Sequence, residues 1–249
     1  MKDGTTLVDT GQNCLLIGEP FSGKTTLAMH FDNPGIVDCD GKLANAVAYH
    51  RRRDPEFKFK YATITTDDSG AHVPIAERWP RLCRETAALV ADPWVKTVII
   101  DSGSNAADYL QDWIANDVSK RSEEIREVKV LSQRDWYSFK QHLQRYVLAG
   151  CSCGKRFVMT VHIRTDKDEV LGTIIYRPTI PGQTGENFGK LWTNYWLCQC
   201  VAVPTDTAHP RGVKYTVRTA STARLQLGCS NPAVPAEWEV TKENLKYLA

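Results

Sequence analysis

The chain has 249 residues, enough for one full hydrophobic core but few for two ordinary domains. Its 31 Lys and Arg residues nearly balance 29 Asp and Glu residues, which excludes a strongly basic, histone-like protein and leaves local nucleic-acid binding open. No run approaches the roughly 18 apolar residues of a membrane span, and the first residues lack the pattern of a signal peptide. We therefore expect a cytoplasmic protein that does not contact a membrane.

Short apolar runs alternate with amphipathic stretches as far as residue 163. Strands are expected at residues 13–17, 35–38, 58–64, 97–101 and 156–163. Helices are expected at residues 24–31, 75–91, 105–121 and 135–148. Asn105 and Asp135 stand where helix N-caps are expected, and Pro80 is expected to bend or shorten its helix. This alternation predicts an α/β fold with a mostly parallel central sheet flanked by helices.

After residue 163 the pattern changes to short β-type runs separated by Gly and Pro. These runs are residues 170–176, 195–203, 213–219 and 225–229. They predict an antiparallel β extension at the C-terminal end of the sheet rather than a second domain. We expect residues 1–249 to form a single domain, with residues 1–11 as an N-terminal tail.

Eight cysteines are spread along the chain. A protein with a full aliphatic and aromatic complement does not need disulfides for stability, so most of these thiols are expected to be reduced and buried. The alternative is a zinc site built from two C-x-C pairs, Cys151 with Cys153 and Cys198 with Cys200. Zinc sites usually have C-x2-4-C spacing, so zinc is the weaker interpretation.

A phosphate-binding motif, G-x-x-x-x-G-K-T, follows the first expected strand and opens the first expected helix. The glycines of such a loop let backbone N–H groups face a polyphosphate, the lysine reaches the β- and γ-phosphates, and the threonine hydroxyl binds Mg²⁺. We expect Lys24 to be catalytic as well. The residues expected to bind the nucleotide are Gly18, Glu19, Pro20, Phe21, Ser22, Gly23, Lys24, Thr25 and Thr26.

A second Mg²⁺ ligand is expected where another apolar strand ends. Asp101 follows the apolar run 98–100, at the carboxyl edge of the expected sheet. An ionised carboxylate that loses solvation there is expensive without a cation, which favours Asp101 as a Mg²⁺ ligand alongside Thr25. The alternative is that Asp101 caps the next turn through Ser102 or Ser104.

Further candidates for ATP hydrolysis lie near other strand ends. Asp38 and Asp40 follow the second strand, and Asp40 is the better placed to polarise a water, unless both acids merely terminate the strand. His162 ends a strand at the edge where α/β folds bind ligands, so we expect it to contact the γ-phosphate; the alternative is an ordinary core histidine. Arg218, on a late β run, is either an arginine finger toward a neighbouring subunit or an exposed strand residue.

Four segments carry a resemblance to a known family: GEPFSGKT, GIVDCD, TVIIDSGS and FVMTVHIR. In this order they resemble the RecA-like branch of the P-loop ATPases. They are most similar to phage-encoded, AAA-type nucleotide-binding proteins with a minimal RecA core, which act as recombinases or single-strand annealing proteins. The resemblance runs from about residue 11 to about residue 219, and it implies a RecA-like core that uses ATP and Mg²⁺.

The same resemblance assigns roles to individual residues. It implies that Asp40 takes the place of the glutamate that activates water, and that His162 reports the γ-phosphate to the adjoining loop. Two departures weaken the match. Asp40 is shorter than glutamate, and Thr216 stands where the lysine of an intersubunit K-x-R pair, ending at Arg218, belongs.

In the family, loops that follow such strands bind DNA, which points to residues 164–190 here. Cations suit phosphates and aromatic rings suit bases, and the segment holds Arg164, Lys167, Arg177 and Lys190 with Tyr176 and Phe188. A plain surface hairpin is the alternative, because four acids share the segment: Asp166, Asp168, Glu169 and Glu186. The densest basic cluster lies elsewhere, at Arg51, Arg52 and Arg53 with Lys58 and Lys60, and is expected to be a solvated loop.

These observations favour an ATPase that binds single-stranded DNA in phage-type homologous recombination, by annealing or strand exchange. The expected partners are single-stranded DNA, further copies of the chain in a ring or filament, and a single-strand-binding protein in the cytoplasm of a bacterial host. One alternative is a P-loop motor such as a ring helicase or packaging ATPase. The other is a nucleotide-gated binding module without enzymatic activity, or a small-molecule kinase.

Overall fold

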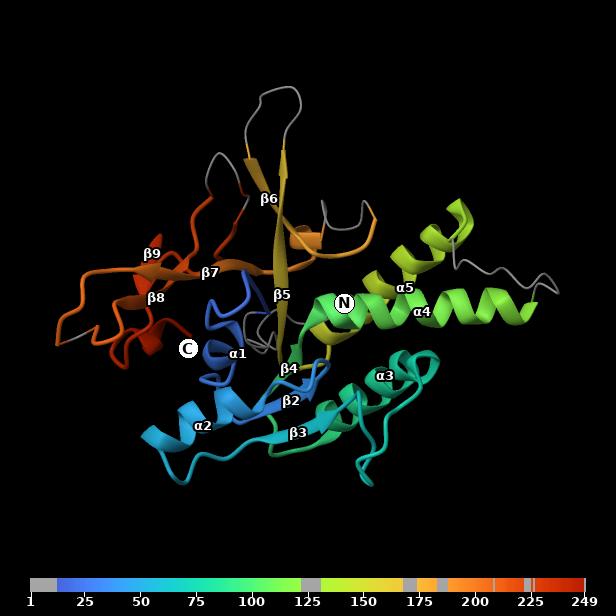
Figure 1. Ribbon diagram of the computed structural model, residues 1–249, viewed down its shortest axis with the longest axis horizontal. Helices are drawn as coiled ribbons and strands as arrows, with labels where there is room; N and C mark the ends of the chain where they lie inside the picture. Colours follow the sequence, from blue (N-terminus) through green and yellow to red (C-terminus); the bar gives the residue numbers. More distant parts are fainter. Residues whose placement is uncertain are drawn as a thin grey trace, which may run out of the picture.

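The computed structural model describes residues 13–121, 131–167, 174–182, 188–207, 209–221, 225 and 227–248. The expected tail at residues 1–11 and most of the expected run at 170–176 lie outside these residues. Within them, a central sheet is flanked by helices and extended by antiparallel strands (Figure 1). The α/β fold expected from the sequence is confirmed.

The described residues form one nine-stranded sheet. Its strands are β1 (Cys14–Gly18), β2 (Pro34–Asp38), β3 (Lys60–Thr63), β4 (Thr97–Asp101), β5 (Arg156–Lys167), β6 (Ile174–Pro178), β7 (Asn194–Ala202), β8 (Val213–Arg218) and β9 (Glu237–Glu239). The order across the sheet is β3-β2-β4-β5-β1-β7-β8-β9, and β6 pairs with β5 outside this row. The strand β9 was not expected from the sequence, and β3 is shorter than the expected strand at 58–64.

The strand β7 corrects one prediction. Its run was expected within the antiparallel extension, yet β7 pairs in parallel with β1 on one side and antiparallel with β8 on the other, so it joins the parallel strands to the antiparallel extension. The first five residues of β7 are all buried, which is typical of a strand covered on both faces. A continuous apolar run therefore indicated a central strand here.

Helices cover the parallel part of the sheet, and their bounds depart from the expected ones in several places. They are α1 (Lys24–Ala28), α2 (Ala44–Arg53), α3 (Ile75–Ala91), α4 (Gly103–Arg121) and α5 (Gln133–Cys151), with short 3-10 helices at Gly189–Leu191 and Asn244–Leu248. The helix α2 was not predicted, because only Ala46 and His50 of its residues are buried and the apolar pattern is too sparse. The helix α1 ends three residues before the expected position.

The helix starts also differ from the predictions. Ser132, not Asp135, is the N-cap of α5; its side chain accepts the Asp135 N–H while the Asp135 carboxylate accepts the Ser132 N–H, which forms a capping box. The helix α4 starts at Gly103, before Asn105, whose N–H points to the Ser102 hydroxyl. Pro80 does not shorten α3, since the helix continues to Ala91.

Two apolar clusters sandwich the sheet because successive strand residues point to opposite faces. In β1, Leu15 and Ile17 pack in the cluster that includes α3, α4 and α5. The alternate residues Cys14 and Leu16 pack in the cluster that includes α1, α2 and the C-terminal segment. No helix among the described residues has the length and apolar character needed to cross a membrane.

The register of the parallel strands sets the place of the functional residues. Gly18 at the end of β1 pairs with His162 on β5, and Asp38 at the end of β2 pairs with Asp101 at the end of β4. The strands β1, β2 and β4 end at these residues, whereas β5 runs past His162 to Lys167 instead of ending at residue 163 as expected; its pairing with β1 ends at His162. The four residues therefore lie at one edge of the parallel sheet, where α/β folds bind ligands.

Candidate active site

The phosphate loop joins β1 to α1 and folds around the side chain of Lys24. The Lys24 ammonium donates to the carbonyl oxygens of Gly18 at 2.9 Å and Glu19 at 2.7 Å, and lies 3.5 Å from the Ser22 hydroxyl. Burial lowers the pKa of Lys24, whereas the neighbouring Asp101 and Asp40 raise it. The loop thus holds a buried cation that faces acidic residues of the same site.

The glycines of the loop are required by close packing against the C-terminal strands. A Cβ on Gly18 would lie 2.4 Å from the carbonyl oxygen of Cys198 on β7. Gly23 has a φ of 83°, and a Cβ there would meet the ring of Tyr215 on β8 at 3.0 Å. Phe21 also has a positive φ, 64°, and its side chain is 91% exposed. The loop is therefore seated on β7 and β8 with its tip in solvent.

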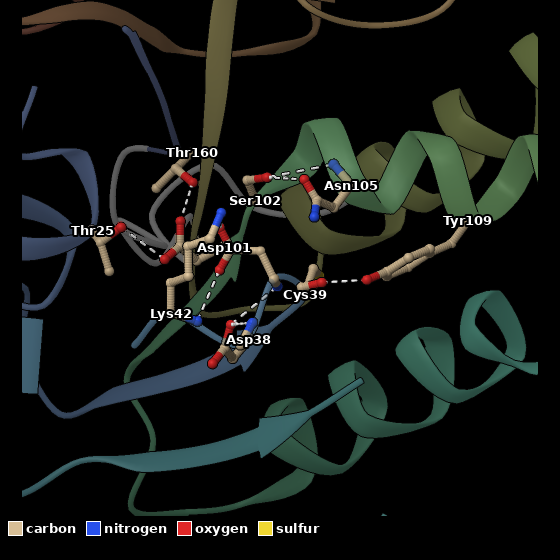
Figure 2. A network of polar contacts seen from close by, with 11 residues as sticks. Thr25, Asp38, Cys39, Lys42, Asp101, Ser102, Asn105, Tyr109 and Thr160 are labelled. Carbon is tan, nitrogen blue, oxygen red and sulfur yellow. Dashed lines mark hydrogen bonds and ion pairs between the residues drawn. The ribbon is translucent and has the colours of Figure 1, made fainter. Parts of the chain in front are cut away.

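Asp101 accepts hydrogen bonds from two threonine hydroxyl groups (Figure 2). Thr25 of α1 donates to one carboxylate oxygen at 2.8 Å, and Thr160 of β5 donates to the other. Burial raises the pKa of Asp101, while these two hydrogen bonds lower it. The two residues expected to hold Mg²⁺, Thr25 and Asp101, are thus in direct contact.

Asp38 and Asp40 have different surroundings. Asp38 is buried, and one of its oxygens accepts the N–H groups of Asp40 at 3.2 Å and Gly41 at 2.8 Å, so this carboxylate fixes the turn after β2. Burial raises the pKa of Asp38 to about 6, with Asp40 and Asp101 adding to the effect. Asp40 is only partly buried, and its carboxylate lies 3.6 Å from the exposed Lys42 ammonium. Asp38 therefore holds the turn, whereas the role of Asp40 in activating water stays a prediction.

His162 lies beside the phosphate loop. Its backbone N–H donates to the Ser104 hydroxyl at 3.1 Å, and its ring Nδ1 is buried with no hydrogen-bond partner in the described part of the chain. Burial lowers the pKa of His162, the nearby charges of Lys24 and Lys42 lower it further, and Asp40 opposes them. A neutral imidazole with an unsatisfied nitrogen at this place suits a polar ligand at the loop.

Arg218 is not part of this cluster. Its guanidinium donates to the Glu237 carboxylate across the β8–β9 pair, at 3.0 Å from Nε and 2.6 Å from Nη2. Within its own chain it therefore serves as a cross-strand ion pair. A role as arginine finger concerns the nucleotide of another subunit and stays a prediction.

A family model described as "AAA domain" matches residues 10–194, about three quarters of the chain. The chain belongs to the AAA domain family. No curated protein matches the sequence. The family membership makes this chain a nucleotide-binding P-loop ATPase, in agreement with the motif and the fold.

The site of this AAA domain fits ATP and Mg²⁺. Thr25 and Asp101 provide the hydroxyl and carboxylate oxygens that Mg²⁺ prefers, and the loop amides with Lys24 provide donors for phosphate oxygens. The unsatisfied Nδ1 of His162 adds a group that a phosphate oxygen can satisfy. A Mg²⁺ ion held by Thr25 and Asp101 would supply positive charge against the negative charge that develops on the phosphate during hydrolysis.

Sequence reasoning missed three residues of the AAA domain site: Thr160, Ser104 and Lys42. Thr160 had a signal, since it is a polar residue inside the apolar strand β5 and, two residues before His162, points to the same face. The sequence suggests Ser104 only as a partner of Asp101 in the next turn, whereas its hydroxyl accepts a hydrogen bond from the backbone N–H of His162. Lys42 had no signal, because its proximity to Asp40 depends on the turn that Asp38 fixes.

The other sequence candidates lie away from the site or partly outside the described residues. Arg164 and Arg177 pair across the β5–β6 hairpin, but residues 168–173 and 183–187 of the expected DNA-binding segment are not described. All eight cysteines are free, and the described residues contain no group of three or more His, Cys, Asp or Glu side chains placed to hold a metal ion, so the zinc alternative has no support. The basic cluster at 51–53 lies at the end of a helix rather than in a loop.

Proposed function

We propose that this AAA domain protein hydrolyses ATP and binds single-stranded DNA in phage-type homologous recombination, by annealing or strand exchange, with a RecA-like core. The observation that carries the proposal is the continuity of β5. His162 beside the phosphate loop and Arg164 in the candidate DNA-binding hairpin belong to the same strand.

For hydrolysis, each group of the site has a task suited to its surroundings. Lys24 and the loop amides bind the phosphates, and Thr25 and Asp101 hold the metal ion. Asp40 accepts a proton from the attacking water, because its partly exposed carboxylate is less desolvated than that of Asp38. Asp38 holds the turn that carries Asp40.

For coupling to DNA, nucleotide must bind one state of the hairpin better than the other. His162 supplies such a difference: its Nδ1 has no hydrogen-bond partner among the described residues, and a hydrogen bond to the γ-phosphate would fix the ring at the base of the hairpin. Beyond it, Ile163 pairs with Pro178 and Arg164 with Arg177. When β5 is ordered, the two arginines therefore stand directly opposite each other on neighbouring strands. Phosphates of a single strand are suitable ligands for such a pair.

The first test is steady-state ATP hydrolysis with and without single-stranded DNA, at low and high salt. We expect DNA to stimulate hydrolysis, less so at high salt, and Lys24→Ala to abolish it. Lys140→Ala, an exposed lysine on α5, is the matched control and should behave as wild type. An ATP hydrolysis rate that DNA does not change would refute the recombination role. Directional separation of DNA strands would indicate a motor instead.

The coupling is tested separately with His162→Ala. We expect this variant to bind DNA without nucleotide as wild type does, and to lose the increase in DNA affinity that ATP causes. An unchanged ATP-dependent increase would show that His162 does not transmit the signal.

A further inference from the structure

A row of aromatic rings crosses the surface formed by α2, the segment after it and β3. The His50 ring stacks on Phe57 with centroids 4.5 Å apart, and Phe57 stacks on Phe59 at 5.9 Å. Phe59 then contacts Tyr61 at 5.7 Å. The row begins at a buried ring and ends at Tyr61, which is 60% exposed. Its outer end therefore offers a free aromatic face.

Basic residues share the segments that carry this row. Exposed basic side chains on the same segments are Arg51, Arg52, Arg53, Lys58 and Lys60. The Arg51 guanidinium lies 6.0 Å from the Phe59 ring centroid, and that of Arg53 lies 3.7 Å from the Tyr49 ring centroid. Lys60 is paired with Asp92. The other four cations exceed the two acids of the stretch, Asp54 and Glu56, so this surface is locally positive.

The position of β3 leaves this surface open. The strand is the last one in the described sheet, so nothing in that sheet pairs with its outer edge. In Figure 1, α2 and β3 lie at the lower edge of the molecule, whereas the β5–β6 hairpin projects at the upper edge. The surface is thus separate from the candidate DNA-binding hairpin.

We propose that the surface of Arg51, Arg52, Arg53, Lys58 and Tyr61, here called the α2–β3 surface, binds single-stranded nucleic acid. Positive side chains beside a stackable ring match a phosphate backbone with unpaired bases. A duplex would offer the charge but keep its bases inside the helix. The inference rests on the proposed function only for the choice of DNA as the natural strand.

The α2–β3 surface is also connected to the nucleotide site. His50, at the start of the aromatic row, makes a 3.0 Å hydrogen-bond contact through Nε2 with the carbonyl oxygen of Thr26 in α1. Thr26 directly follows Thr25, which contacts Asp101. The surface that binds the nucleic acid is therefore linked, through His50 and Thr26, to the helix that carries the Mg²⁺-binding threonine.

The experiment measures binding of fluorescent oligo-dT and oligo-U to the full chain across a range of salt concentrations. Tyr61→Ala removes the exposed ring, and Tyr61→Phe keeps it. The double variant Arg52→Gln/Lys58→Gln removes two exposed cations that make no ring contact in the row. On α5, Tyr137→Ala and the double variant Arg134→Gln/Lys140→Gln are the matched controls, since these side chains are also exposed.

We expect Tyr61→Ala to weaken binding by about tenfold and Tyr61→Phe to retain it, as loss and retention of one stacking partner predict. The double cation variant should lower the slope of log affinity against log salt by about 1.4, or about 0.7 per phosphate contact. Both α5 controls should bind as wild type. Equal affinity for oligo-dT and oligo-U would show that the surface recognises the phosphates and unpaired bases and does not distinguish ribose from deoxyribose.

The outcomes separate this inference from the proposed function. If wild type binds oligo-dT and the α2–β3 variants bind equally well, the inference is wrong and the proposed function is untouched. If the variants lose binding while wild-type hydrolysis ignores DNA, the inference holds and the proposed function is wrong. Absence of any binding of single strands by wild type at low salt would refute both.

Discussion

Thr160 on β5 donates a hydrogen bond to Asp101 on the adjacent strand β4. Because Thr25 donates to the other oxygen of the same carboxylate, Asp101 is held from two sides by residues far apart in the sequence. Both hydrogen bonds lower the pKa of Asp101 against the effect of burial. Thr160 is therefore a positioning residue for the carboxylate that we propose binds Mg²⁺.

Thr160→Val should weaken both the fold and the response to Mg²⁺. Thr160 is fully buried, and loss of a hydrogen bond to a charged group should lower the free energy of unfolding by about 1.5–3 kcal/mol. ATP hydrolysis should require more Mg²⁺, while Thr160→Ser, which keeps the hydroxyl, should need wild-type Mg²⁺. Urea unfolding and Mg²⁺ titration of hydrolysis measure the two effects. Equal Mg²⁺ dependence of the Val and Ser variants would contradict this role.

Asp38 should make stability fall as the pH rises through the acid range. Burial raises its folded-state pKa from the usual 3.8 to about 6, so between these values the folded state binds more protons than the unfolded state. The free energy of unfolding therefore decreases from about pH 4 to about pH 6. Asp38→Asn keeps the acceptor oxygen and removes this titration, so its stability curve should be flatter in that window. Urea unfolding across this range checks it, with the exposed Asp54→Asn as control; parallel curves for wild type and Asp38→Asn would contradict it.

Replacing Phe21 by glycine should give a more stable protein than replacing it by alanine. Its φ of 64° is left-handed, which costs a residue with a Cβ about 1–2 kcal/mol, and its side chain is too exposed to repay this by packing. Phe21→Gly should therefore be more stable than Phe21→Ala by about 0.5–1 kcal/mol, after the entropy cost of glycine is subtracted. Thermal unfolding of the two variants decides; the reverse order would show that the loop tip is not strained.

Arg218→Gln and Glu237→Gln should have the same small effect. The pair is partly exposed, so either change should lower the free energy of unfolding by less than about 1 kcal/mol. ATP turnover should be unchanged in both variants at a protein concentration that favours oligomers. A large loss of turnover in Arg218→Gln alone would instead assign Arg218 to the nucleotide site of a neighbouring subunit.

The sequence was sufficient for those parts of the site that depend on local pattern. The loop around Lys24 and the strand ending at Asp101 are defined by contiguous residues, and both have the structure expected of them. Parallel register then brings Asp38 beside Asp101, as follows from any sheet whose strands end at one edge.

Features that depend on contacts between distant segments could not be predicted. The direction of β7 is set by its pairing with β1, and its residues alone do not reveal that partner. The helix α2 escaped prediction because a mostly polar helix lacks the apolar period on which such predictions rely. Thr160 was overlooked because its importance comes from Asp101, 59 positions away in the sequence.

The strand β5 extends well beyond the sheet edge at which the site lies. Its first half is clamped between β1 and β4, and its last residues leave the sheet to pair only with β6 among the described strands. From His162 to Lys167 the strand extends about 16 Å, at about 3.3 Å per residue. A rotation of about 10° at His162 would displace the far end by about 3 Å. A small change in the direction of β5 at His162, beside the phosphate loop, would therefore move the far end of the strand by about the length of a hydrogen bond.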